Sequence, residues 1–384
     1  MKKRTSSARR ICLWTVFLFF LPGFLLAAVR EGDERLWTLA VAVPAVLLLC
    51  GLVFSRLLSM DRFLTVVSVS LAALGILLMT GQPEQAVSQA LRSAGALFFL
   101  FLGVSVIHIY RPSVTAVLVP AVISLAMLAV PLADASVSVP LSFPAVSLLM
   151  IAFVALLSMR RQLAALLLGL AGTVMLLAQS ATAAAAVWSV TFLLLFWSSG
   201  GHPAYLLAGT SAVVLAGLGA SILRPDLFSI PADAPASVLS AASPLSLLGP
   251  ETAEAIPADL PLGSTSLLPA AALRYGLVFS ACIALLYPAL LIRGGSLAIT
   301  SRSRFHGLAA MGSVLLLGLS AVSALLGDFG LSPVEALPLP LLSADFASLA
   351  SSLFLTGLLC GVSARNKADL EDDARLSMLA GGAR

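Results

Sequence analysis

The chain has 384 residues, of which 60% are hydrophobic and only 10% charged, and its mean hydropathy is +1.05. A soluble domain needs far more charge on its surface, so this composition excludes a soluble globular protein. The net charge of +4 comes from basic residues scattered between apolar runs, with no cluster of the size that nucleic-acid binding requires.

Apolar runs of membrane-spanning length follow one another along the chain. A transmembrane helix needs about 20 mainly apolar residues, and about 12 segments approach or exceed this length. The sequence therefore predicts an all-α polytopic integral membrane protein with spans at Ile11–Val29, Leu36–Ser55, Phe63–Thr80, Ala94–Tyr110, Val114–Pro131, Phe143–Ser158, Gln162–Gln179, Ala181–Trp197, Ala204–Leu223, Leu267–Ile292, Gly307–Leu326 and Leu341–Val362.

The basic residues predict the orientation of these spans. With the N-terminus inside, most of the 22 Lys and Arg residues fall in cytoplasmic segments, as the positive-inside rule requires. The exceptions are Arg30, Arg35, Arg92 and Arg224 outside, and Arg274 within a span. Both termini are therefore expected in the cytoplasm. Arg274 is costly at that depth unless it binds a ligand, snorkels to the interface or pairs with an acidic loop residue.

One predicted loop is long. About forty residues lie outside between Leu223 and Leu267, and a loop of that length in a compact protein is usually functional or disordered. Its acidity is equally consistent with simple solvation of an outward surface. The acidic residues are Asp226, Asp233, Glu251, Glu254 and Asp259.

No motif for a resident cofactor or metal is present. The four cysteines each lie inside a predicted span, and there is no Walker loop, no GxGxxG motif after a strand and no HExxH motif. No cofactor or metal is therefore assigned from the residues alone.

A proline-rich stretch, Gly330–Ser343, precedes the last span. Pro333, Pro338 and Pro340 cannot continue a helix, because proline lacks an N–H and has a fixed φ. The stretch is either a rigid loop between spans or a re-entrant segment, and irregular backbone at membrane depth must be satisfied by protein or water. The order Gly-x-x-Pro-Val-x-x-x-Pro-Leu-Pro-x-x-Ser resembles the signature before the final span of the SEDS family (FtsW, RodA, SpoVE).

The resemblance extends over a ten-helix family core, expected here at residues 61–364. Two extra N-terminal helices would occupy residues 1–60, the long external loop residues 224–266, and a cytoplasmic tail residues 365–384. The resemblance is carried by Asp61-Arg62-Phe63-Leu64, Leu74-Gly75-Ile76-Leu77, Gln89 and Gly95, Gln179-Ser180, Ile256-Pro257, Gly276, and Arg293-Gly294.

The family belongs to bacterial peptidoglycan synthesis in division, cell shape or sporulation, at the cytoplasmic membrane. The resemblance implies polymerisation of lipid II, a class B penicillin-binding protein as partner, contact with membrane lipid, and a divalent cation if the chain is active. It also implies substrate-binding roles for Arg274, Gln179, Pro333, Pro338, Pro340 and Ser343.

The departures from the family pattern concern charged residues. The catalytic aspartate of the family's external loop falls on Thr265, which cannot act as a general base. Asp259 in the same loop is the candidate replacement. Pro144 is kept, whereas the glutamate and lysine expected after it are absent, and Ala344-Asp345-Phe346 replaces Tyr-Gly-Gly.

These departures leave the enzymatic status open between two readings. The chain is either a glycosyltransferase that uses Asp259, or a catalytically silent scaffold that binds a penicillin-binding transpeptidase or a lipid-linked precursor. A third interpretation is a lipid flippase or transporter. Such a protein needs ionisable residues along a path through the membrane, and the predicted spans hold almost none apart from Arg274.

Overall fold

The computed structural model describes residues 14, 16–111, 113–133, 141–224, 267–328 and 337–381, and every regular element in these residues is helical. The first half of the chain contains η1 (Val16–Phe20), α2 (Leu21–Glu31), α3 (Glu34–Leu48), η2 (Leu49–Phe54), α4 (Ser55–Leu57), α5 (Arg62–Leu78), α6 (Pro83–Ile109), α7 (Val114–Ala133) and α8 (Ser142–Ser158). The rest of the chain contains α9 (Gln162–Ala178), α10 (Thr182–Ser198), α11 (Pro203–Leu223), α13 (Leu267–Tyr275), α14 (Leu277–Thr300), α15 (Arg304–Asp328) and α16 (Phe346–Gly381).

The all-α polytopic membrane fold is confirmed. Among the described residues, 7 helices or helical runs are long and apolar enough to cross a membrane, and α5, α8, α9 and α10 are shorter apolar helices. A helix or helical run lies at each predicted span, although the number that cross the membrane stays a prediction.

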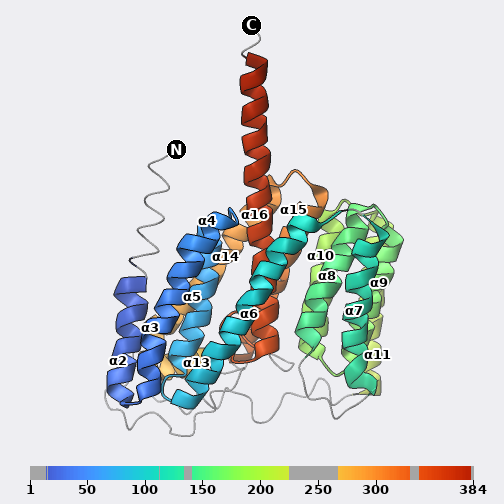
Figure 1. Ribbon diagram of the computed structural model, residues 1–384. Helices are drawn as coiled ribbons and strands as arrows, with labels where there is room; N and C mark the ends of the chain where they lie inside the picture. The colour runs from blue at the N-terminus through green and yellow to red at the C-terminus, as the bar shows by residue number, and fades with distance from the viewer. Residues whose placement is uncertain are drawn as a thin grey trace.

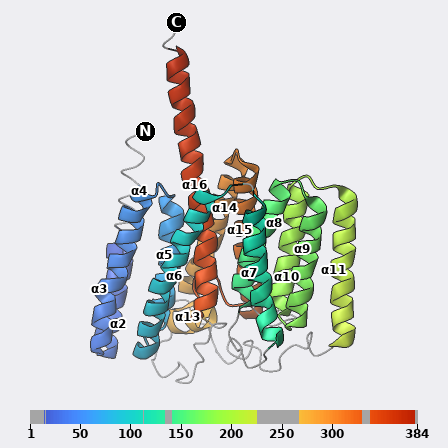
Figure 2. The same cartoon turned by 45° about the vertical axis from the view of Figure 1, so that its right-hand side comes forward.

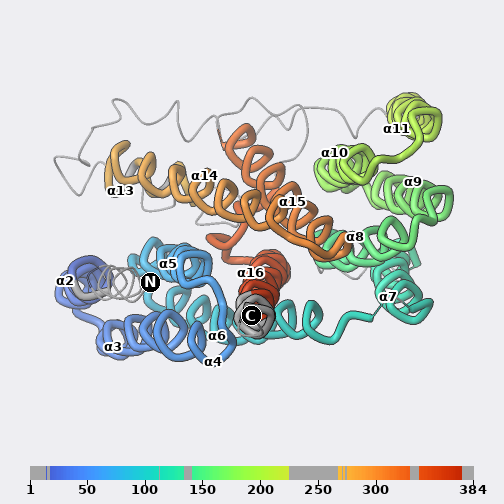
Figure 3. The backbone as a smooth tube through the Cα atoms, turned by 90° about the horizontal axis from the view of Figure 1, so that it is seen from above, coloured from blue at the N-terminus to red at the C-terminus, as the bar shows by residue number. Residues whose placement is uncertain are grey.

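The helices stand side by side around α16, which continues well beyond the bundle at one end (Figures 1 and 2). Seen along the bundle, α2 to α5 lie on one side of α16 and α7 to α11 on the other, with α13, α14 and α15 along a third face (Figure 3). The most extensive packing is between α16 and α6. Here Gly357 lies against the backbone of α6 at Leu100, where a Cβ atom would overlap the carbonyl oxygen.

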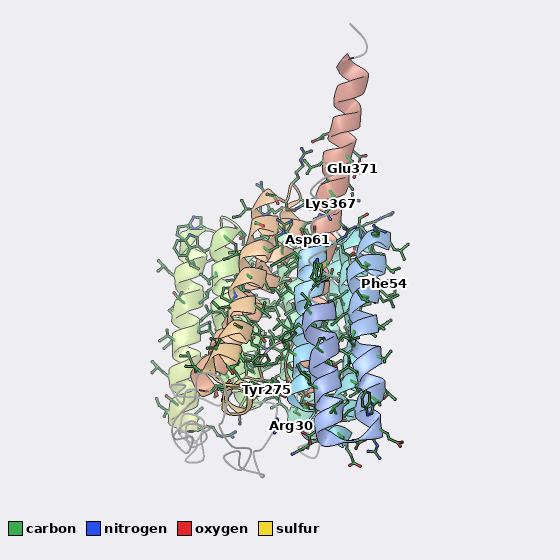
Figure 4. The ribbon with its side chains drawn as sticks, turned by 90° about the vertical axis from the view of Figure 1, so that its left-hand side faces the viewer. Arg30, Phe54, Asp61, Tyr275, Lys367 and Glu371 are labelled. Atoms are coloured by element: carbon green, nitrogen blue, oxygen red, sulfur yellow. The ribbon has the colours of Figure 1, made fainter. Side chains whose placement is uncertain are left out.

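Loops that the sequence assigns to the cytoplasm contact one another at the end where α16 leaves the bundle, here named the inner end. Lys367 of α16 donates to the backbone oxygens of Ser59 and Met60, at 3.0 and 3.1 Å. Arg304 donates to the Ser199 oxygen at 2.7 Å. Figure 4 shows Lys367 beside Asp61 at this end, with Tyr275 and Arg30 at the opposite, outer end. The two ends therefore agree with the predicted alternation of loops.

Asp61 begins α5 and also ties it to α14. Its Oδ1 atom accepts from the Phe63 N–H at 2.9 Å, as an N-cap does. Its Oδ2 atom accepts from Arg293 Nε and a terminal guanidinium nitrogen at 3.0 and 2.5 Å. Arg293 and Gly294 lie inside α14, whereas the sequence placed them after the helix, because α14 runs on to Thr300.

Three of the element boundaries that differ from the predicted spans have an identifiable cause. Helix α6 begins at Pro83 rather than at Ala94, because the polar Gln89 and Ser93 are buried against protein and do not end the helix. The tenth span is divided at Gly276, where φ is 91°, a conformation that favours glycine. The last helix begins at Phe346 rather than at Leu341, since the preceding proline-rich residues are not helical.

Candidate functional site

The described part of the proline-rich stretch, Leu337–Ser343, is a non-helical segment buried inside the bundle. We name it the signature segment. Leu342 and Ser343 are fully buried, and Leu341 has a φ of 66° in a tight turn. Because irregular backbone at membrane depth is tolerated only where protein or water satisfies it, its hydrogen-bond partners define the site.

Side chains of two neighbouring helices hold the signature segment. Gln89 of α6 donates from Nε2 to the Ser343 oxygen at 2.8 Å. The Tyr287 hydroxyl of α14 donates to the Pro340 oxygen at 2.6 Å. Both donors are buried, with exposed fractions of 1% and 4%, so these bonds compete little with water. The segment is therefore fixed near each end.

A glycine on α5 lets the signature segment approach closely. A Cβ atom built on Gly75 would lie 2.5 Å from the Leu342 backbone oxygen, which no real structure tolerates without movement. Gly75 belongs to the Leu74-Gly75-Ile76-Leu77 pattern that carried part of the family resemblance. The glycine thus serves close backbone packing beneath the segment.

The departure Ala344-Asp345-Phe346 has a local structural role. Asp345 Oδ2 accepts from the Ser348 N–H at 2.8 Å, which places Asp345 as the cap of α16. Ser343 Oγ accepts from the Asp345 N–H at 3.0 Å. These side chains satisfy backbone donors at the start of the last helix.

An arginine reaches the end of the signature segment. Arg92 NH1 donates to the Ala344 oxygen at 3.0 Å, and the Arg92 side chain is exposed. The sequence placed Arg92 in an outer loop, but it lies in the third turn of α6, within a helix that can cross the membrane. The signal missed in the sequence was Pro83 followed by Glu84, a typical helix start.

Five buried side-chain oxygens have no hydrogen-bond partner within the described part of the chain, and one of them, Gln89 Oε1, belongs to a residue that contacts the signature segment. The other four are Ser70 Oγ, Ser93 Oγ, Ser320 Oγ and Asp328 Oδ1. Asp328 ends α15 and is 3% exposed. Asp328 stands out in the sequence only as an acidic residue at the end of an apolar run.

The other residues predicted to bind substrate are distributed as follows. Pro340 is buried and Pro338 half-buried, both in the signature segment. Gln179 donates from Nε2 to the Leu128 oxygen and so joins α9 to α7. Arg274 lies in α13 at the outer end, with its side chain outside the described part of the structure. Pro333, Asp259 and Thr265 lie outside the described residues.

An apolar groove of about 1000 Å³ opens between α6 and α7. Apolar side chains such as Leu102 and Val119 line most of it, and His108, Tyr110 and Arg111 lie at its inner end. Its apolar lining suits a lipid chain. Among the described residues, no group of three His, Cys, Asp or Glu side chains could hold a metal ion.

Comparison with known proteins gives a family match and several structural matches. Residues 267–368 match the model of the FtsW, RodA and SpoVE family, described as cell cycle protein. A search of curated proteins by sequence gives no match.

The structure of RodA, the rod-shape-determining protein of Thermus thermophilus, is similar with a TM-score of 0.57 and 21% identity, over 79% of this chain and 96% of RodA. An aspartate-to-alanine variant of that RodA is similar with a TM-score of 0.58 and 21% identity, over 79% of this chain and 97% of the variant. A third match is a chain from a structure that describes the structural coordination of polymerisation and crosslinking by a peptidoglycan synthase complex. Its TM-score is 0.61 and its identity 21%, over 80% of this chain and 98% of the matched chain.

The structural matches establish the fold, and the family match covers the region that contains the signature segment. The chain is therefore a multi-pass membrane protein with the fold of these RodA structures, and its residues 267–368 match the FtsW, RodA and SpoVE family model.

Proposed function

We propose that this protein polymerises lipid II in bacterial peptidoglycan synthesis, with the signature segment and Arg92 at the substrate site. The observation that carries the proposal is the buried signature segment, which α5, α6 and α14 hold at the outer end beside a cationic side chain. The RodA fold and the family match over residues 267–368 support it.

In this reaction a sugar hydroxyl attacks the anomeric carbon of a lipid-linked saccharide. The new carbon–oxygen bond forms as the bond to the pyrophosphate breaks, and the pyrophosphate leaves with the electron pair. Arg92 suits the departing group, because a guanidinium has five N–H donors and Arg92 uses one on the Ala344 oxygen. A cation at this point stabilises the charge that develops in the transition state.

The groove between α6 and α7 would hold the prenyl chain of the substrate. Its lining is mainly apolar, and α6 also carries Arg92 and Gln89 beside the signature segment. One helix would thus contact both the chain and the polar head of a lipid-linked precursor. A divalent cation would assist the pyrophosphate if the enzyme is active.

The hydroxyl's proton needs an acceptor, and we propose Asp259 of the external loop for this role. A positioned carboxylate contributes about 10²–10⁴-fold in rate, equal to roughly 3–5 kcal/mol of transition-state stabilisation. Asp259→Ala should therefore abolish detectable polymerisation while leaving expression and partner binding intact. Full activity of this variant would show that the base lies elsewhere.

The test of the function is lipid II polymerisation by the protein in proteoliposomes, alone and with candidate class B penicillin-binding proteins. Glycan chains made by the wild type, and absent without the protein, are expected. No product with any partner would contradict the polymerase proposal.

Thr265 supports a second candidate function. Where the family resemblance expects a catalytic aspartate, a threonine cannot accept the proton. In this case the protein would be a scaffold that binds a penicillin-binding transpeptidase or a lipid-linked precursor without turnover. Co-purification of a class B penicillin-binding protein with an inactive wild type would favour the scaffold.

A further inference from the structure

The groove of about 1000 Å³ between α6 and α7 lies, on both of these helices, in the inner half of the bundle. On α6 it is lined from Leu102 to Arg111, over the last turns of the helix and the residues that follow. On α7 it is lined from Thr115 to Ile123, in the first half of the helix. An apolar chain in this groove therefore lies well below the signature segment, which is at the outer end.

Helix α6 joins the groove to Arg92, the proposed contact of the pyrophosphate. Leu102, the first groove residue on α6, follows Arg92 by ten residues, which is about 15 Å along the helix axis. Val106 lies within about 40° of Arg92 around the helix, so the groove begins near the same face. Tyr110, at the inner end of the groove, follows Arg92 by eighteen residues, or about 27 Å.

The prenyl chain of a lipid-linked saccharide is built from isoprenoid units, each with four carbons along the chain. An extended carbon chain advances about 1.2 Å per bond, as the extended protein backbone does, so one unit covers at most about 5 Å. Two units therefore cover at most about 10 Å and end before Leu102, whereas about three units reach the groove and about six reach Tyr110.

Polar and tightly packed side chains close the inner end of the groove. The Tyr110 ring stacks on Phe305 of α15, and the Tyr110 hydroxyl forms a hydrogen bond with Ser158 Oγ of α8 at 3.2 Å. His108 and Arg111 also line this end. An apolar chain that continued past these side chains would lose its apolar contacts and would separate polar groups from water.

We propose that the groove selects the prenyl chain of the lipid-linked saccharide by length, so that affinity rises once the chain exceeds about three isoprenoid units and stops rising beyond about six. This rests on the proposed function and adds which lipids the site accepts. Membrane lipid tails are as apolar as the groove, so dispersion contacts alone favour the prenyl chain little. The prenyl chain is favoured because its head, bound at Arg92, holds it at a high effective concentration beside the groove.

The test measures binding of lipid II with prenyl chains of two, six and eleven isoprenoid units to the full-length protein in nanodiscs, at equal mole fractions of each lipid in the bilayer. The six-unit and eleven-unit lipids should bind within about twofold of each other, because both reach the inner end of the groove. The two-unit lipid should bind at least about fivefold more weakly, because it lacks the tethered contact with the groove.

Ser105→Phe and Ala116→Phe fill the groove from its two walls, since both side chains line it. Ser211→Phe on α11 is the matched control, because Ser105 and Ser211 are both exposed and each donates to the carbonyl oxygen four residues earlier at 2.9 Å. Ser211 does not line the groove. The partition of each lipid into the bilayer is the same for every variant, so affinity ratios between variants report only contacts with the protein.

Each groove variant should bind the six-unit and eleven-unit lipids at least about fivefold more weakly than wild type does, and the two-unit lipid with unchanged affinity. Ser211→Phe should match wild type with all three lipids. Unchanged binding of the long lipids in both groove variants would mean that the groove holds another chain, such as the tail of a membrane phospholipid. That result overturns the inference, as would an equal loss for all three lipids or a similar loss in Ser211→Phe.

Binding needs no turnover, so the outcomes separate this inference from the proposed function. Polymerisation by a wild type that binds all three lipids equally retains the function and rejects selection by length. Length-dependent binding by a wild type that makes no glycan retains the groove and rejects the polymerase. A wild type that binds none of the three lipids rejects both.

Discussion

At the scale of single residues, Asp61 shows how one carboxylate organises the inner end. It caps α5 and pairs with Arg293, with its side chain 8% exposed against 45% for the arginine. The pair joins helices that are distant in the sequence, next to the contacts of Lys367 with the preceding loop. Removing one partner from a partly buried ion pair of this kind lowers the stability of the protein more than removing one partner from an exposed pair.

Asp61→Asn should lower the free energy of unfolding by about 1–3 kcal/mol, because Arg293 loses its ionic partner while asparagine still caps α5. The measurement is thermal unfolding of the purified protein in detergent. Glu84→Gln is the control, since the Arg35–Glu84 pair is 57% and 85% exposed and should contribute less than about 1 kcal/mol. Equal losses in the two variants would contradict the role given to Asp61.

The position of a residue in the fold was predictable from the sequence only where a local pattern carried it. Proline spacing predicts that Pro338, Pro340 and Ser343 lie in a non-helical segment, as they do, while their substrate-binding roles stay a prediction. The contact of Arg92 with the signature segment was missed, because it depends on a backbone oxygen that folding brings beside the side chain. No sequence window contains that neighbour.

At the scale of elements, the signature segment depends on the close approach of α5. Glycine is the only residue type that fits at position 75 without a clash with the Leu342 oxygen. From α14, the Tyr287 hydroxyl donates a hydrogen bond to the Pro340 oxygen of the segment. The long α6 supplies Gln89 and Arg92 from successive turns. The segment is thus positioned by three helices, each of which can be tested separately.

Gly75→Val should displace the signature segment and reduce lipid II polymerisation at least tenfold, because a Cβ atom would lie 2.5 Å from the Leu342 oxygen. Initial rates in proteoliposomes measure the loss. Gly217→Val on α11 is the matched control, since nothing lies within 4 Å of a Cβ atom there, and it should keep wild-type activity. Similar losses in both would remove the argument for close packing at Gly75.

Tyr287→Phe should cost about 1–3 kcal/mol of stability, because the buried Pro340 oxygen loses its donor. Limited proteolysis within the sequence 337–343 should become faster than in wild type, which shows that the loss is local to the signature segment. Unchanged cleavage and unchanged melting would mean that Tyr287 does not hold the segment.

The helices were predictable where apolar runs were continuous, and their ends were not. The start of α6 was predicted wrongly, because Gln89, Ser93 and Arg92 lower the hydrophobicity of its first turns, although Gln89 and Ser93 are buried against protein. The break at Gly276 was not predicted, because a single glycine within an apolar run does not reveal its φ of 91°. Tertiary contacts decided the first boundary, and the backbone conformation of Gly276 decided the second.

At the scale of the whole molecule, the distribution of basic residues and the contacts between loops divide the bundle into the same two ends. The loops predicted to be cytoplasmic meet where α16 leaves the bundle, and α13 lies at the opposite end (Figure 1). The positive-inside rule assigns the first of these ends to the cytoplasm. On that assignment the signature segment, at the start of α16, is predicted to lie on the outer side.

Reporter fusions test that orientation. A fusion at Arg384 should report the cytoplasm, and one within Ala232–Ser240 should report the outside, because alternate loops carry the basic residues. A reporter active only in the cytoplasm and one active only outside give the two readouts. The same compartment for both sites would refute the predicted number of spans.

The measurement that tests the central claim most directly is the initial rate of lipid II polymerisation by wild type, Arg92→Gln and Arg35→Gln in proteoliposomes. If the signature segment and Arg92 form the substrate site, wild type makes glycan and Arg92→Gln is slower by about tenfold or more, the cost of one charge-assisted contact. Arg35→Gln, which alters only an exposed ion pair at the same end, should keep the wild-type rate. An inactive wild type, or an Arg92→Gln variant as fast as wild type, would contradict the account.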